Sequence, residues 1–427
     1  MSPDAQHKTR TLWLAGALHA FTHVYQVALM PLYLLIQKDL KLTSVSQATL
    51  LVTVMMVGYV LPAYPLGMAA DRFSRKKLLA WGLAINSVGF VLLSFAPGYG
   101  TALLAVLLTG VGGSFYHPAA TAMVARLCPV GTGKALGLVG IGASVGFFAG
   151  PIFAGWRVGM LETNLGATAW RRPVLELGLL GLVMTAVFVW LAPKESAASD
   201  EERKPAPAAK LFPTAVLWGF FLLAAFAFSL RDFAGSSMGS LGSLFLQKAH
   251  GYTPWLTGLA LSGIFLASAI SNPLFGHLSD RGRMKWTMMV LLVAAGIVAL
   301  FPHVSAGATM PTYLFYGFFF MASYPMVEAA LMESVPDEVR GRVFGLFLTV
   351  GGLIGNVSHW AVGAWVKQLG DRAAEPEGYF FGYAFLAGLL IVSLFGLPCL
   401  HAIRKREHLD YAPPAEDSAV HQPQLPT

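Results

Sequence analysis

The sequence predicts an all-α membrane protein with twelve transmembrane helices, arranged as two six-helix halves with both termini on the cytoplasmic side. Three observations lead to this prediction. Hydrophobic residues make up 56% of the 427 residues and charged residues 12%, against about 25% charged in soluble domains. The chain divides into apolar runs of about 20 residues, the length that crosses a bilayer. A short charged hairpin also occurs once in each half.

Each apolar run must be helical, because a spanning backbone has to satisfy its own hydrogen bonds. A β-barrel would show alternating segments of about ten residues instead, and the sequence has none. The predicted spans are 11–37, 45–70, 76–96, 100–126, 133–156, 173–193, 213–246, 253–278, 284–303, 308–333, 341–367 and 378–402.

Basic residues gather in every even-numbered predicted loop, which is the positive-inside pattern. This pattern predicts cytoplasmic termini in a multi-pass protein of the plasma (inner) membrane. It also argues against a nucleic-acid partner, although the net charge is +7. The loop after the fifth span is the exception, since it carries Arg157, Arg171 and Arg172.

The segment 195–210 is charged, rich in alanine and proline, and without apolar periodicity. It is therefore predicted to be a flexible cytoplasmic linker between an amino-terminal bundle at 1–194 and a carboxy-terminal bundle at 211–404. Residues 405–427 are predicted to form a flexible cytoplasmic tail. The two cysteines show neither a metal-ligand spacing nor a disulfide framework.

The charged hairpins share a glycine, an Asp-Arg pair and a basic cluster. A carboxylate at a helix end can pair with an arginine or cap a neighbouring helix, so the hairpins are predicted gating elements rather than loops that only set topology. Small residues in the fifth span allow close helix approach, and are assigned to gating as well. The predicted gating residues are Gly67, Asp71, Arg72, Arg75, Asp280, Arg281, Gly146, Gly150 and Pro151.

These motifs resemble the major facilitator superfamily over essentially the whole chain. The first hairpin matches the family's loop signature, with Ser74 in place of its second glycine. The fifth span resembles the family's antiporter motif, with Ala154 in place of one glycine. The resemblance implies alternating access by two bundles, a hairpin that latches the halves in the outward-facing state, and export.

A narrower resemblance is to fosmidomycin-resistance-like exporters, on His19, Gln26, His117 and Pro118. Two positions depart from that pattern, because His23 and Ala119 stand where those exporters have acids. The resemblance therefore does not supply a proton-carrying acid in the amino half, and it does not identify the substrate.

Polar side chains within the amino-half spans are predicted to bind substrate, because burying them in lipid costs several kcal/mol unless they are paired or face water. His19, His23 and Gln26 share one helix face at i, i+4 and i+7, and Tyr116 and His117 lie before a helix-breaking proline. The alternative is that they form a hydrogen-bonded packing cluster.

In the carboxy half, Arg231, Tyr324, Asn356 and His359 are predicted substrate contacts. Asp232 and Glu328 are predicted proton-coupling acids, because a desolvated carboxyl can hold a proton near neutral pH. Arg231 and Asp232 point about 100° apart on a helix, so they need not pair. The alternative is a static salt-bridge network.

The sequence favours a proton-coupled exporter (antiporter) of a small organic, anionic or zwitterionic compound. An organic-anion uptake symporter or a facilitator is the alternative. No nucleophile–base set, metal cluster or phosphate loop is recognisable, so neither enzyme activity nor a cofactor is expected. The expected partners are a small-molecule substrate, protons and membrane lipid, and the protein is expected to be a monomer.

Overall fold

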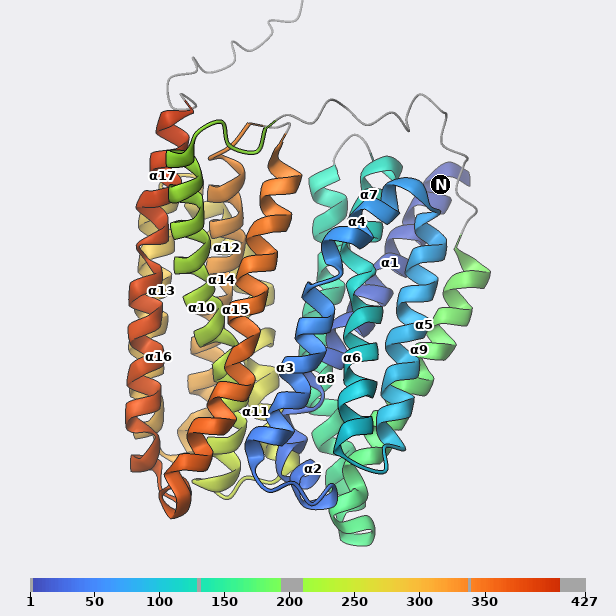
Figure 1. Ribbon diagram of the computed structural model, residues 1–427, viewed down its shortest axis with the longest axis vertical. Helices are drawn as coiled ribbons and strands as arrows, with labels where there is room; N and C mark the ends of the chain where they lie inside the picture. Colours follow the sequence, from blue (N-terminus) through green and yellow to red (C-terminus); the bar gives the residue numbers. More distant parts are fainter. Residues whose placement is uncertain (1–2, 129–131, 193–209, 337–338, 408–427) are drawn as a thin grey trace, which may run out of the picture.

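The computed structural model describes residues 3–128, 132–192, 210–336 and 339–407, without the side chains of 3–5, 71–72 and 132–134. All regular structure in these residues is helical, so the predicted all-α class is confirmed. Helices α1–α9 lie together as one bundle, and α10–α17 form a second bundle beside it (Figure 1). The predicted linker at 195–210 and tail at 405–427 fall almost wholly outside the described residues.

The amino-half bundle consists of α1 (Pro3–Val27), η1 (Met30–Leu32), α2 (Tyr33–Asp39), α3 (Val45–Val60), α4 (Ala63–Arg72), α5 (Arg75–Ser94), α6 (Tyr99–Ser114), α7 (Tyr116–Leu127), α8 (Thr132–Leu165), η2 (Gly166–Trp170) and α9 (Arg171–Leu191). The carboxy-half bundle consists of α10 (Ala215–Lys248), α11 (Pro254–Leu266), α12 (Ser268–Ser279), α13 (Arg283–Leu300), η3 (Phe301–His303), η4 (Ala306–Ala308), α14 (Thr309–Met332), α15 (Arg340–Leu369), η6 (Gly370–Ala374), η7 (Pro376–Tyr379), α16 (Phe380–Ser393) and α17 (Gly396–Arg406).

Eleven helical stretches among the described residues are long and apolar enough to cross a membrane. The predicted spans at 133–156 and 173–193 fall within one of them, Ala135–Leu191, where η2 joins α8 to α9. That stretch has 57 residues, whereas one crossing needs about 20. Large hydrophobic side chains such as Trp190 and Phe381 are exposed, as expected for a surface in contact with lipid.

Several predicted spans are built from two short helices in series, and in two of them a proline explains the break. Proline has no N–H, so the carbonyl four residues before it loses its partner within the helix. Pro62 separates α3 from α4, and Pro118 follows the break between α6 and α7 at Phe115. These breaks allow the two ends of a span to point in different directions.

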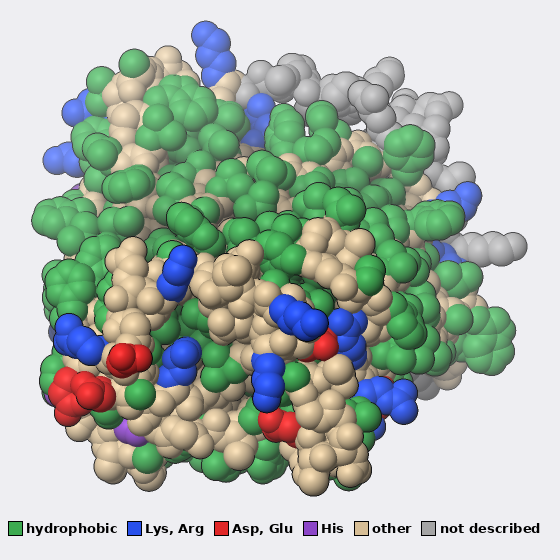
Figure 2. Space-filling view, turned by 60° about the horizontal axis from the view of Figure 1, so that its bottom comes forward, with side chains coloured by type: hydrophobic (Ala, Val, Ile, Leu, Met, Phe, Trp, Pro, Cys, Tyr) green, Lys and Arg blue, Asp and Glu red, His purple; other side chains and the backbone are tan. Residues whose placement is uncertain are grey.

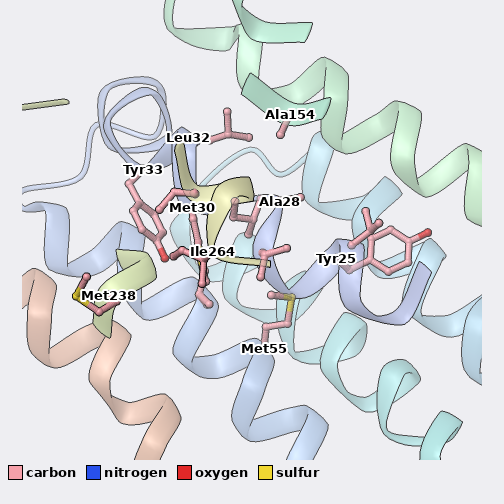
Figure 3. Close-up of a cluster of buried hydrophobic side chains, with 14 of the residues drawn as sticks. Tyr25, Ala28, Met30, Leu32, Tyr33, Met55, Ala154, Met238 and Ile264 are labelled. Carbon is pink, nitrogen blue, oxygen red and sulfur yellow. The ribbon is translucent and has the colours of Figure 1, made fainter. Parts of the chain in front are cut away.

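The two halves meet at the end of the molecule away from Ala192 and Lys210. We call this the opposite end, and the end that carries Ala192 and Lys210 the linker end. Figure 3 shows Met30 and Tyr33 of the amino half beside Met238 and Ile264 of the carboxy half. This contact surface, which we call the seam, joins η1, α3 and α8 to α10, α11 and α15.

Hydrogen bonds across the seam involve serine, threonine and tyrosine hydroxyls and a glutamine amide. The Tyr33 hydroxyl bonds to Ser240 Oγ at 2.8 Å, and Thr53 donates to the Asn356 carbonyl at 2.9 Å. The other bonds between the halves in the described residues are Ser243 to the Met30 carbonyl, Gln247 to the Pro31 carbonyl, Ser262 to the Phe148 carbonyl, and the Trp360 N–H to Thr53. All lie in the half of the helices nearer the opposite end.

Glycines let α8 and α11 approach at backbone distance within the seam. A Cβ added at Gly258 would overlap the Pro151 carbonyl oxygen, and one at Gly155 would overlap the Pro254 carbonyl oxygen. Any larger side chain at either position would therefore push the halves apart.

The halves separate toward the linker end, where the two bundles diverge (Figure 1). A second apolar cluster lies there, distinct from the main core, and all its members belong to the carboxy half; they include Phe221, Val327 and Val343. The structure is therefore sealed at the opposite end by hydrogen bonds and close glycine contacts between the halves.

Acidic and basic side chains gather on the opposite end, below a hydrophobic flank (Figure 2). Arg171 pairs with Asp39 at 2.7 Å, and Arg157 pairs with Glu176. These ion pairs explain why the loop after the fifth predicted span departs from the positive-inside pattern, since two of its three arginines are neutralised by acids.

Candidate functional site

Aromatic and polar side chains of α1 and α7 form one cluster in the amino half. We call His19, His23, Gln26, Tyr116 and His117 the amino-half cluster. The ring of His19 stacks on Tyr116 with centroids 4.5 Å apart and lies 4.8 Å from His23 and 5.1 Å from His117. Residues that the sequence places about 100 positions apart are therefore in direct contact.

Backbone and amide oxygens orient two of these rings. His19 Nδ1 lies 3.0 Å from the Val139 carbonyl oxygen, and His23 Nδ1 lies 2.8 Å from Gln26 Oε1. Both oxygens are acceptors, so Nδ1 carries the proton in each ring and Nε2 keeps its lone pair. His19 Nε2 is buried and has no hydrogen-bond partner, and it is therefore available to bind another group.

The amino-half cluster touches both an exposed space and the seam. His117 is exposed although four aromatic rings surround it, those of His19, His23, Tyr59 and Tyr116. On the other side, His23 stacks on Phe147 of α8 at 4.2 Å, and Phe147 stacks on Phe265 of the carboxy half at 4.8 Å. Only the ring of Phe147 therefore separates His23 of the cluster from Phe265 of the carboxy half.

A charged group lies inside the carboxy half on α10 and α14. We call Arg231, Asp232, Tyr324 and Glu328 the carboxy-half cluster. Arg231 is 2% exposed, and its Nη2 and Nε lie 2.8 and 3.0 Å from Asp232 Oδ1. Helix geometry does not require these neighbours to pair, but they do pair, because the long arginine side chain folds back to reach the carboxylate.

Aromatic rings complete the environment of that guanidinium. Arg231 lies 4.1 Å from the ring centroid of Tyr324 and 5.5 Å from that of Phe228, which are distances of cation–π attraction. Glu328 lies one helical turn after Tyr324 on the same helix, α14. One buried cation therefore pairs with Asp232, and a second carboxyl group lies one turn along the helix that packs against it.

Asn356 and His359, which the sequence assigns to substrate binding, take part in the seam. His359 Nδ1 bonds to Ser240 Oγ at 2.7 Å, and Ser240 bonds in turn to Tyr33. The Asn356 amide donates to the Gly352 carbonyl at 2.7 Å. Both side chains are buried in this conformation, so substrate could meet them only after the seam rearranges.

The hairpin residues lie at the linker end. Gly67 faces Pro118 across α4 and α7, whereas the side chains of Asp71 and Arg72 lie outside the described part of the chain. Arg75 begins α5, and Asp280 is 67% exposed with only a 3.5 Å contact to Arg283. In this conformation the described hairpin residues do not bridge the two halves.

Sequence reasoning missed a charged network at the same end. Glu333 accepts from Arg283 at 2.5 Å and from Arg404 at 3.3 Å. Arg404 is 71 residues away, so only the fold reveals this contact.

The small residues of α8 perform two packing roles. Gly146 meets the Ala20 carbonyl of α1 without room for a Cβ, and Gly150 meets Val27 in the same way. Pro151 lies on the seam against Gly258. The predicted gating residues of α8 are therefore in contact with α1 on one side and with the other half on the other.

The family model of the Major Facilitator Superfamily matches residues 12–359. The chain belongs to the Major Facilitator Superfamily. The predicted family is confirmed, and the chain is a multi-pass membrane transporter and not an enzyme.

This superfamily member is similar to proteins named for drug resistance. It is 24% identical over 359 residues to the fosmidomycin resistance protein of Escherichia coli strain K12, which covers 81% of this chain and 86% of that protein. It is 26% identical over 306 residues to the multi-drug resistance efflux pump PmrA of Streptococcus pneumoniae, which covers 69% and 74% of the two chains.

Solved structures share the fold. A bacterial homologue of the human lysosomal transporter Spinster, in an inward-facing and unoccupied conformation, superposes with a TM-score of 0.71 at 17% identity. The match covers 95% of this chain and 97% of that one. At this identity the likeness establishes the architecture of the superfamily member and nothing finer.

Proposed function

We propose that this transporter exports a small organic compound in exchange for protons, by alternating access of its two halves. The observation that carries the proposal is the carboxy-half cluster, where one buried guanidinium pairs with Asp232 at 2.8 Å and lies over Tyr324, with Glu328 one helical turn further along α14. The amino-half cluster supplies the contacts with substrate from the other half. Relatives named for efflux support export as the direction of transport.

The topology we propose has twelve crossings, with α8 and α9 as separate spans and both termini in the cytoplasm of a cell whose plasma membrane holds the monomer. The length of the Ala135–Leu191 stretch and the basic even-numbered loops support it. With this orientation the conformation described above is inward-facing, sealed on the outside by the seam.

The charged cluster favours a zwitterionic substrate for an antiporter. Exchange requires that substrate and proton bind alternately. A positive group on the substrate meets this requirement, because it competes with protons for the carboxyls of Asp232 and Glu328. A negative group on the same molecule then pairs with Arg231 as the arginine leaves Asp232.

One observation favours the alternative, an organic-anion symporter. Asp232 already occupies Arg231 at 2.8 Å, so a purely anionic substrate competes with this carboxylate. Protonation of Asp232 would release the guanidinium, and proton and anion would then bind together. The same pair therefore predicts antiport for a zwitterion and symport for an anion.

Transport in membrane vesicles tests the proposal. Fosmidomycin and a panel of small zwitterions and anions are first screened by thermal shift on the purified protein, because a ligand that binds only the folded state raises its apparent stability. Compounds that bind are then followed in inside-out vesicles with and without a proton gradient. Accumulation that needs an acidic interior supports the exchange, and accumulation without any response to the gradient identifies a facilitator.

Variants locate the proton carrier. Glu328→Gln and Asp232→Asn should each weaken gradient-driven accumulation while sparing substrate exchange, which needs no net proton movement. Thr349→Ser, a conservative change on the neighbouring α15, is the matched control. If both acid variants keep full accumulation, the acids are structural and the histidines of the amino-half cluster become the proton carriers.

A further inference from the structure

Three histidines of the amino-half cluster converge on one point. One ring nitrogen from each of His19, His23 and His117 lies within 4.8 Å of the other two. His19 and His23 are one helical turn apart on α1, and His117 comes from α7. Nothing in the transport cycle proposed above requires three imidazoles at such a short separation.

The two α1 histidines are held as metal ligands usually are. Metal-binding histidines commonly donate the second ring N–H to a backbone carbonyl, carboxylate or other oxygen, which fixes tautomer and ring orientation. The Val139 carbonyl plays this part for His19 at 3.0 Å, and Gln26 Oε1 plays it for His23 at 2.8 Å. His19 Nε2 is left buried and without a partner, a cost that a bound cation would remove.

The ligand set defines the class of ion. Imidazole nitrogens suit Zn²⁺, Cu²⁺, Ni²⁺ and Co²⁺, whereas Mg²⁺ and Ca²⁺ prefer oxygen. Zinc–nitrogen bonds of about 2.0–2.1 Å place ligand nitrogens about 3.3 Å apart around a tetrahedral ion. The three nitrogens lie within 4.8 Å of one another, so side-chain shifts of about 1.5 Å or less would bring them to that spacing.

We propose that His19, His23 and His117 bind one divalent transition-metal ion of the Zn²⁺ class. The exposed face of His117 provides the entry path and leaves a fourth coordination position open. Tyr116 and Phe147 hold the rings of His19 and His23 in place by stacking. The site is a property of the amino half alone, so it stands whether or not the proposed direction and proton coupling of transport are correct.

Calorimetric titration with Zn²⁺ tests the site on the full chain, purified in detergent without a histidine tag and stripped with a chelator. The wild type should bind one equivalent, and Co²⁺ should give the visible d–d bands of a tetrahedral nitrogen site. His117→Ala should weaken Zn²⁺ binding by at least about 100-fold, more than the 10–100-fold typical of losing an outer contact. Gln26→Ala should weaken it by about 10–100-fold, and Gln26→Glu should restore it.

His303→Ala is the matched control, because His303 is exposed at the opposite end and lies against Phe380 outside the cluster. It should bind Zn²⁺ as the wild type does. The unfolding temperature of each metal-free variant shows whether it is folded. Absence of stoichiometric binding to the wild type, or equal affinity in folded His117→Ala, would overturn the proposal.

Discussion

Gly258 offers the most direct test of the seam, because its position leaves no space for a methyl group. A Cβ there would overlap the Pro151 carbonyl oxygen of α8 and approach the Gly155 Cα at 3.5 Å. Overpacking of this kind costs about 1–3 kcal/mol. In Gly258→Ala this steric cost destabilises only the conformations in which the seam is closed. The equilibrium between the closed and the open seam should therefore shift toward the open seam by about 5–150-fold.

Spin-label distances measure that shift. Labels at Lys41→Cys and Glu375→Cys report on exposed positions of the two halves at the opposite end, after Cys128 and Cys399 are replaced by serine. The wild type should give mainly the short distance of the sealed end. Gly258→Ala should add a longer distance as the seam opens.

Two glycines of α8 control for the substitution itself. Gly140 has no atom within 4 Å of an added Cβ, so Gly140→Ala should leave the distances unchanged. Gly146→Ala would overlap the Ala20 carbonyl within the amino half, and should lower thermal stability without opening the seam. Wild-type distances in Gly258→Ala, or the same long distance in Gly140→Ala, would refute the reasoning.

Three further predictions concern single contacts. Tyr33→Phe removes the hydroxyl that bonds to Ser240. It should shift the equilibrium between the closed and the open seam toward the open seam by about 0.5–1.5 kcal/mol, measured in the spin-label assay. An unchanged distance distribution would show that the bond adds no net stability to the closed seam. Arg171→Gln breaks the contacts to Asp39 and two carbonyls, and should lower the free energy of unfolding by about 1–3 kcal/mol, whereas a similar loss in the exposed Arg172→Gln would show a general charge effect. Asp71→Asn should slow transport without changing the unfolding temperature, and an unchanged rate would remove the proposed latch.

Much of the fold could be predicted because lipid restricts what a chain can do. Every apolar run had to be a helix, and the repeated hairpin divided the chain into halves. The ends of the helices were harder to predict from the sequence. α8 continues from the predicted end at 156 to Leu165, since the first residue that stops it is Gly166 at a φ of +56°.

The candidate site was predictable only where its parts lie on one helix. His19, His23 and Gln26 share a face of α1 by spacing alone. The approach of His117, the contact of Glu333 with Arg404, and the pairing of Arg231 with Asp232 depend on helix packing or on side-chain torsions. The sequence contains only a weak indication of the seam, namely that Ser240 and Ser243 lie one turn apart on an otherwise apolar helix.

The ring of Phe147 touches His23 on one face and Phe265 of the other half on the second. Any ligand that moves His23 therefore moves a component of the contact between the halves. Thermodynamic linkage makes the effect reciprocal, so opening the seam must change affinity for that ligand by the same factor that the ligand changes the opening equilibrium. The Phe147 side chain thus couples ligand binding in the amino half to the relative position of the two halves.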